Sequence, residues 1–129
     1  MTGQFSSSIL VVDDDLSVRQ SLESFFDDLD FTVIVASSAE EALGLLVSND
    51  IDVAIVDLRL PEKNGEAFIL EAYRINPRIN FLIYTGSLSY ELDQALRQLG
   101  MSQDQVFLKP LPDLTVLLES INKLYPGGK

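Results

Sequence analysis

Short apolar runs alternate with amphipathic segments along almost the whole chain, and this alternation restricts the fold more than any other feature of the sequence. The apolar runs are typical of buried strands and cover 8–13, 31–36, 52–57, 80–85 and 105–109. Most of them are apolar at successive positions, as in parallel strands that helices cover on both faces. The sequence therefore predicts an α/β protein with a five-stranded parallel sheet.

Each apolar run is followed by a segment whose apolar residues recur at helical spacing. The predicted helices cover 16–29, 38–48, 64–75, 88–99 and 114–124. Ser38 and Glu41 have the spacing of a capping box, and Gly100 is a stop signal for the fourth helix. Because parallel crossovers are right-handed, few ways remain to wind five strand–helix units into a sheet covered on each side.

The length of 129 residues suits a single domain, which we expect at 8–125. Residues 1–7 are expected to form a disordered tail, and residues 126–129 a second tail or the stub of a linker. The hydrophobic fraction of 47% is enough for a proper core. The absence of cysteine and histidine excludes disulfides, Cys or His metal ligands, and His-based catalysis.

The charge and the apolar run lengths restrict the partners. A net charge of −11 disfavours direct binding of nucleic acid by this domain. No apolar run approaches the roughly 20 residues that span a bilayer, and the N-terminus lacks the layout of a signal peptide. We therefore expect a cytoplasmic protein with no membrane contact.

The first apolar run leads directly into three carboxylates in "ILVVDDD", and the other strands also end in polar residues. Asp13 and Asp14 follow the first strand, Asp57 ends the third, Thr85 ends the fourth and Lys109 ends the fifth. In open α/β sheets, ligands bind at the carboxyl ends of the strands. These side chains are therefore expected to converge at one edge.

Clustered carboxylates repel one another, so a divalent cation is expected among them. Oxygen donors without His or Cys favour Mg²⁺, with Mn²⁺ as a substitute, and Mg²⁺ often binds phosphate oxygens as well. Asp57 could then be a nucleophile that forms an acyl phosphate. Lys109 would supply positive charge and Thr85 a hydroxyl donor to the phosphoryl group. Taken singly, each residue also has a structural explanation; Asp15, for example, is more typical of a helix N-cap.

The set of motifs "ILVVDDD", "DVAIVDLRLPEKNG", "FLIYTG" and "VFLKPL" resembles, in order and spacing, the receiver domain of bacterial response regulators. The resemblance covers about 8–124. It implies a doubly wound, flavodoxin-like (βα)5 three-layer sandwich with strand order 2-1-3-4-5. It also implies a cis peptide bond between Lys109 and Pro110.

The resemblance further implies roles for the residues at the strand ends. Asp57 matches the phosphoacceptor, and Asp13 and Asp14 match the acidic pair that holds Mg²⁺. The backbone carbonyl of Arg59 matches a further metal ligand. Thr85 and Lys109 match the hydroxyl and the ammonium that contact the phosphoryl group. In the loop after Asp57, Gly65 permits a close approach or a positive φ.

The function implied is a phosphoacceptor switch of a two-component system, with a signalling role rather than that of a turnover enzyme. A sensor histidine kinase or a phosphotransfer protein would donate the phosphoryl group to Asp57. The domain would catalyse its own phosphorylation and dephosphorylation. Its output would pass to an effector protein or to a missing output domain, and the domain would be a monomer or a weak homodimer.

Two features depart from the family pattern or affect the phosphoryl lifetime. Val106 occupies a position that is usually aromatic, and strand alternation points Phe107 to the opposite face.

We hypothesise that Arg59 reaches over the acidic pocket and touches a carboxylate or, after phosphorylation, the phosphoryl group. Ser87, two residues after Thr85, flanks the same site.

Two alternatives remain open. A phosphatase of the haloacid-dehalogenase-like class would use Asp13 as its nucleophile with Asp15 two residues later, but Asp57 would then be unexplained. A receiver that binds partners without being phosphorylated is the second alternative, and Val106 keeps it open.

Overall fold

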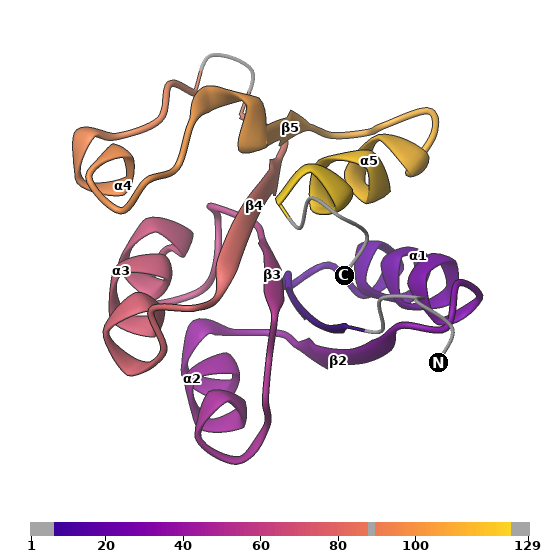
Figure 1. Ribbon diagram of the computed structural model, residues 1–129, viewed down its shortest axis with the longest axis horizontal. Coiled ribbons are helices and arrows are strands. Elements are labelled where there is room, and N and C mark those ends of the chain that lie inside the picture. Colours follow the sequence, from indigo (N-terminus) through magenta and orange to yellow (C-terminus); the bar gives the residue numbers. More distant parts are fainter. Residues whose placement is uncertain (1–6, 88–89, 125–129) are drawn as a thin grey trace.

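A five-stranded parallel sheet forms the centre of the molecule in the computed structural model, which describes residues 7–87 and 90–124 (Figure 1). The strands are β1 (Ser8–Val12), β2 (Thr32–Ala36), β3 (Val53–Val56), β4 (Asn80–Thr85) and β5 (Val106–Leu108). All four strand pairings are parallel, and the order is β2-β1-β3-β4-β5. The predicted fold class and strand order are therefore confirmed.

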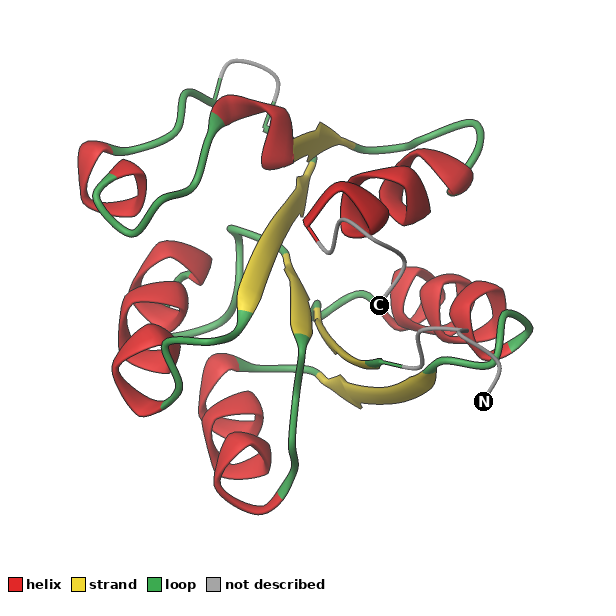
Figure 2. Cartoon of the chain, viewed as in Figure 1, coloured by secondary structure: helices red, strands yellow, loops and turns green. Residues whose placement is uncertain are grey.

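Helices cover both faces of this sheet. They are α1 (Leu16–Asp27), α2 (Ala39–Ser48), α3 (Gly65–Ile75), α4 (Gln94–Arg97) and α5 (Thr115–Leu124), with a short 3-10 helix, η1, at Gln103–Gln105. Helices α1 and α5 lie on one face, and α2, α3 and α4 lie on the other (Figures 1 and 2). The molecule is thus the predicted three-layer sandwich.

The core is divided by the sheet into two apolar clusters, one for each face. Along β1, Leu10 and Val12 pack toward α2 and α3, whereas Ile9 and Val11 pack toward α1 and α5. All four are fully buried, because both faces of the strand are covered. This explains why the strands are apolar at successive positions instead of at every second one.

Polar side chains fix the starts of the first three helices. Asp15 caps α1 by accepting hydrogen bonds from the amides of Ser17 and Val18, as its position in the sequence predicts. Ser38 caps α2 through the Glu41 amide at 3.1 Å. The return half of the predicted capping box differs, because the Glu41 carboxylate accepts from the amide of Ser37 at 2.8 Å.

The fourth helix is much shorter than predicted, and residues 90–93 are not helical. The Leu92 amide donates to Gln103 Oε1 at 2.8 Å, and the Leu92 carbonyl accepts from Arg97 Nε at 3.2 Å. These side chains satisfy backbone groups that a longer helix would have paired. Leu92 and Leu96 are nevertheless buried, so the apolar spacing served packing without a continuous helix. Leu88, part of the predicted helix, lies outside the described residues.

The predicted tails at 1–7 and 126–129 also lie outside the described residues, apart from Ser7, which is 2% exposed. Within the part of the chain that the structure describes, no helix has the length and apolar character to cross a bilayer.

Candidate functional site

Three carboxylates gather at the carboxyl edge of β1 and β3. The Asp13 amide donates to the Ala36 carbonyl at 3.1 Å and the Asp57 amide donates to the Val12 carbonyl at 2.9 Å, so sheet hydrogen bonding continues just past each strand. Carboxylate oxygens of Asp13, Asp14 and Asp57 lie within 4.8 Å of one another. Asp13 and Asp57 are buried, and Asp14 is exposed. The structure thus brings together the acidic residues that the sequence singled out.

Lys109 joins this cluster from the end of β5. Its Nζ donates to Asp13 Oδ2 at 2.8 Å and to Asp57 Oδ2 at 3.1 Å. Its amide donates to the Thr85 carbonyl at 2.8 Å, which ties the end of β5 to the end of β4. The peptide bond between Lys109 and Pro110 is cis, as expected. One ammonium therefore bridges the two buried carboxylates.

Backbone amides occupy the other oxygen of each buried carboxylate. The Asp15 amide donates to Asp13 Oδ1 at 2.9 Å, and the Arg59 amide donates to Asp57 Oδ1 at 3.2 Å. Each oxygen of a carboxylate can accept more than one contact, so both buried acids retain free lone pairs. The loops after β1 and β3 thus orient the carboxylates without filling their coordination capacity.

The protonation equilibria of the cluster reflect burial and ion pairing. Burial raises the pKa of the Asp13 carboxyl above its usual value, and the hydrogen bond from Lys109 offsets only part of this effect. Burial opposes the charge of Lys109, but the hydrogen bonds to Asp13 and Asp57 outweigh it and raise the pKa of the ammonium. Lys109 is therefore positively charged at neutral pH.

The charges in this cluster do not balance. When all are ionised, Asp13, Asp14 and Asp57 with Lys109 carry a net charge of −2. Two like unit charges 4.8 Å apart, the upper limit of these separations, repel by about 3.5 kcal/mol at an effective dielectric constant of about 20. A divalent cation would neutralise this excess, and carboxylate oxygens are the donors that Mg²⁺ prefers. The donor set therefore fits a magnesium ion.

Thr85 and Ser87 form the neighbouring wall of the site. Thr85 is fully buried, and its Oγ1 accepts from the Ser87 amide at 3.4 Å. Between them, Gly86 is exposed, and a Cβ atom at this position would meet no atom within 4 Å.

Arg59 reaches toward this wall instead of toward the acids. Its Nη2 lies 3.5 Å from Ser87 Oγ, and among the described residues it is within ion-pair distance of no carboxylate. The expected contact with a carboxylate is therefore wrong for this structure. Arg59 remains exposed at the mouth of the site, between the loop after β3 and the segment after β4.

Gly65 allows the loop after β3 to fold tightly. A Cβ atom at this position would lie 2.4 Å from the Asp57 carbonyl oxygen and 2.8 Å from Leu58 Cα. The Gly65 amide donates to the Leu58 carbonyl at 3.0 Å. Of the two reasons considered for this glycine, the close approach is the one that applies.

Two residues near the cluster were not singled out from the sequence. Arg19 Nη1 donates to the Asp13 carbonyl at 2.8 Å, and Tyr84 places its ring 5.7 Å from Lys109 Nζ. Arg19 lies four residues after the N-cap Asp15, and this helical spacing points a side chain back toward the first turn. For Tyr84 the sequence holds no comparable signal, because strand alternation separates it from Thr85.

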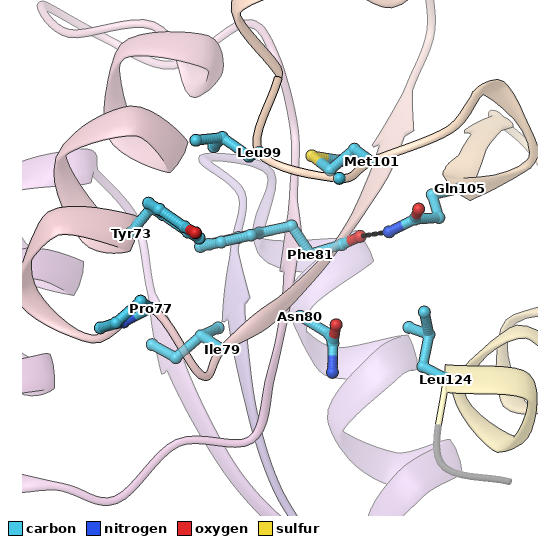
Figure 3. A pocket seen from close by; sticks show the side chains of 10 residues that line it. Tyr73, Pro77, Ile79, Asn80, Phe81, Leu99, Met101, Gln105 and Leu124 are labelled. Carbon is cyan, nitrogen blue, oxygen red and sulfur yellow. Dashed lines mark hydrogen bonds between the residues drawn. The ribbon is translucent and has the colours of Figure 1, made fainter. Parts of the chain in front are cut away.

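A cavity of about 130 Å³ lies at the start of β4, beside Asn80 and Phe81 (Figure 3). The acidic cluster lies at the other, carboxyl end of the strands. Tyr73, Phe81, Leu99 and Met101 are among its lining residues, and Gln105 Nε2 donates to the Phe81 carbonyl at 2.8 Å beside it. None of the predicted site residues lines it. The cavity is therefore not the candidate site.

Comparison with known proteins decides the family. Residues 9–122 match the family described as the response regulator receiver domain. The chain belongs to this family. It is thus a receiver domain of the kind found in two-component response regulators, a family of signalling domains. It is 31% identical over 116 residues to the response regulator SaeR of Staphylococcus aureus, an alignment that covers 90% of this chain. The alignment covers 50% of SaeR, so the chain spans about half the length of this relative.

Solved structures agree with this assignment. A CheY-like response regulator receiver domain protein from Methanospirillum hungatei has a TM-score of 0.80 and 25% identity, covering 93% of this chain and 94% of its own. The response regulator TrrA of Thermotoga maritima, solved in complex with Mg²⁺ and BeF, has a TM-score of 0.78 at 23% identity. That comparison covers 92% of this receiver and 98% of TrrA, and it shows the shared fold.

Proposed function

We propose that this receiver is a phosphoacceptor switch in which Asp57 receives a phosphoryl group in a Mg²⁺-dependent reaction. The observation that carries the proposal is the cluster itself: three carboxylates within 4.8 Å of one another, with Lys109 bridging Asp13 and Asp57. The family membership and the Mg²⁺–BeF complex of TrrA support the same reading.

The metal would be held by Asp13, Asp14 and Asp57 together with the backbone carbonyl of Arg59. When bound, Mg²⁺ supplies positive charge that offsets the charge of the phosphoryl oxygens. Mn²⁺ would fit the same oxygen donors, because both cations accept carboxylate ligands.

In the reaction, a carboxylate oxygen of Asp57 attacks the phosphorus of phosphohistidine. The new O–P bond forms as the P–N bond breaks, and the imidazole leaves with the electron pair of that bond. Lys109 already contacts Asp57 Oδ2 at 3.1 Å, so its charge is in place for the phosphoryl oxygens. Thr85 would donate its hydroxyl to the same group.

The donor would be a sensor histidine kinase or a phosphotransfer protein, and the output would pass to an effector protein or an output domain. Val106 packs toward the α3–α4 side and Phe107 toward the α1–α5 side, as strand alternation predicted. The switch would therefore work through Thr85 without an aromatic residue at position 106.

The experiment is phosphorylation by phosphoramidate, a donor with a P–N bond, followed by intact mass spectrometry and mapping of the labelled residue. We expect Mg²⁺-dependent labelling of Asp57, and loss of labelling in Asp57→Asn. Asp15→Asn is the matched control, because asparagine also caps helices well and Asp15 lies outside the acidic cluster.

Labelling of Asp13 in Asp57→Asn would favour the haloacid-dehalogenase-like alternative. That alternative has little support here, since Asp15 is committed to capping α1. No labelling of the wild-type protein by phosphoramidate or by a kinase, together with no Mg²⁺ binding, would contradict the proposal and favour an unphosphorylated interaction module.

A further inference from the structure

Tyr84 stands next to Thr85 in β4 but faces the other side of the sheet. It is 6% exposed and belongs to the apolar cluster beneath α1 and α5. In the register of β4 and β5 it is paired with Phe107, whereas Thr85 is paired with Leu108. Tyr84 therefore lies beside the end of β5, close to where Lys109 follows that strand.

Both ends of the Tyr84 side chain contact the segment that carries Lys109. The ring centroid lies 5.7 Å from Lys109 Nζ, within the range of a cation–π contact. The hydroxyl oxygen accepts a hydrogen bond from the Leu111 amide at 3.1 Å. Lys109 and Leu111 flank Pro110, so a single side chain fixes the segment on both sides of the proline.

These contacts matter because the polar partners of Lys109 change during phosphoryl transfer. Asp13 and Asp57 both accept from its Nζ, and one oxygen of Asp57 becomes part of the new O–P bond. A lysine side chain has four flexible carbons and must be restrained to keep its charge in place. The face of the Tyr84 ring is electron-rich but carries no net charge and is not altered by phosphoryl transfer, so its attraction for the ammonium does not depend on the state of Asp57.

We propose that Tyr84 is a positioning residue for Lys109. Its ring lies under the Lys109 ammonium and holds it in place, while its hydroxyl anchors the backbone of Leu111. The inference rests on the proposed function, since it assigns Lys109 to the phosphoryl group. Among the described residues, the polar and ring contacts of Tyr84 are with Leu111 and Lys109 and not with the acids, so it would act on the phosphoryl group only through Lys109.

The test compares Tyr84→Phe, which keeps the ring and removes the hydroxyl, with Tyr84→Leu, which removes both. Phosphorylation of Asp57 by phosphoramidate at saturating Mg²⁺ is followed by intact mass spectrometry. We expect Tyr84→Leu to slow the rate about tenfold, in line with the strength of a partly desolvated cation–π contact. Tyr84→Phe should slow it only about twofold, because the hydroxyl acts on Lys109 through Leu111.

Leu82→Ala is the control for lost packing, since Leu82 is fully buried in the same cluster two residues earlier in β4. It should lower the free energy of unfolding in urea yet leave the phosphorylation rate within about twofold, since the cation–π contact with Lys109 and the hydrogen bond from Leu111 both belong to Tyr84. Equal rates in Tyr84→Leu and the wild type, or equal slowing in Leu82→Ala and Tyr84→Leu, would overturn the proposal.

NMR provides a readout that does not need phosphorylation. A ring below the ammonium shifts the ε-methylene protons of Lys109, and this shift should persist in Tyr84→Phe and disappear in Tyr84→Leu. Unchanged Lys109 shifts in folded Tyr84→Leu would overturn the positioning role. If the wild type shows the ring shift but is never phosphorylated, the proposed function fails while the contact stands.

Discussion

Helices α3 and α4 lie side by side on one face of the sheet, but the structure holds them in different ways. The α3 helix has eleven residues, four of them buried, and Asn64 caps its start through the Ala67 amide at 2.9 Å. The α4 helix has four residues, one of them buried, and its N-cap Asp93 makes no side-chain cap hydrogen bond. Apolar packing therefore fixes α3 much more firmly than α4.

Besides the buried Leu92, polar side chains hold the segment before α4. Tyr90 donates from its hydroxyl to Glu66 Oε2 on α3 at 2.5 Å, and Gln103 accepts from the Leu92 amide. Such contacts contribute about 1 kcal/mol each and can be broken one at a time. The loop after Asp57 leads into α3, and the chain after Thr85 leads into the α4 segment. The site therefore lies between a firmly packed helix and a segment whose contacts can open locally.

The largest effects on the free energy of unfolding are expected when a buried apolar side chain is shortened to alanine, once on each helix. Phe68→Ala on α3 should lower the free energy of unfolding by about 4 kcal/mol, because Phe68 is fully buried between firmly packed elements. Leu96→Ala on α4 should cost about 2 kcal/mol, because a single turn can relax into the space that it leaves. Urea denaturation measures both changes in the free energy of unfolding. Equal losses would contradict the conclusion that packing fixes α3 more firmly than α4.

The start of α3 offers a sharper test of close packing. Gly65→Ala should lower the free energy of unfolding by about 2 kcal/mol, because the new Cβ would overlap the backbone of Asp57 and Leu58. It should also slow phosphorylation of Asp57. Gly44→Ala, in an open position within α2, should instead raise the free energy of unfolding by about 0.5–1 kcal/mol. A neutral Gly65→Ala would show that the loop after β3 is adaptable.

On the α4 side, alkaline pH should weaken the Tyr90 contact. Burial, together with the hydrogen bond to Glu66, raises the pKa of Tyr90 above its usual value of about 10. The folded state then keeps the phenol proton that the unfolded chain loses, so this contribution is complete below about pH 10 and falls as the pH rises further. Wild-type stability should decline more steeply above pH 10 than that of Tyr90→Phe, by up to about 1.4 kcal/mol per pH unit. If the stability of the wild type and of Tyr90→Phe declined equally above pH 10, the raised pKa of Tyr90 would be contradicted.

At neutral pH the same variant measures the hydrogen bond itself. Tyr90→Phe should lower the free energy of unfolding by about 1 kcal/mol, because it leaves Glu66 Oε2 without the hydroxyl but keeps the ring. Amide hydrogen exchange should become faster in residues 90–97 and stay unchanged in α3. Faster exchange in both helices would show that they open together.

The smallest effect is expected where the loop after β3 and the segment after β4 touch across the mouth of the site. Arg59 Nη2 and Ser87 Oγ are 3.5 Å apart, and this exposed contact joins a residue two positions after Asp57 to one two positions after Thr85. Arg59→Asn should shorten the half-life of phosphorylated Asp57 by about threefold, as expected for an exposed interaction of a fraction of a kcal/mol. Ser87→Ala is the companion variant and should act in the same direction. Identical half-lives of phosphorylated Asp57 in the wild type and Arg59→Asn would show that Arg59 does not influence the lifetime of the phosphoryl group.

Much of the fold and site followed from the residues alone. Asp13, Asp57 and Lys109 were predicted to meet because each follows a strand, and parallel strands bring their carboxyl ends to one edge. Asp15 was predicted to cap α1 because its side chain acts only on its immediate neighbours. The predicted fourth helix was wrong in length, since apolar spacing does not show whether Gln103 will bind the backbone of Leu92.

The sequence by itself thus determined the three-layer sandwich and the identity of the acidic cluster, because apolar periodicity and strand ends are local properties. Only the tertiary structure decided that the Tyr84 ring lies against Lys109, that Tyr90 joins the α4 segment to Glu66, and that Arg59 contacts Ser87. Each of these pairs comes from different elements of the chain. Their distances depend on how the packed layers are placed relative to one another, which no local pattern contains.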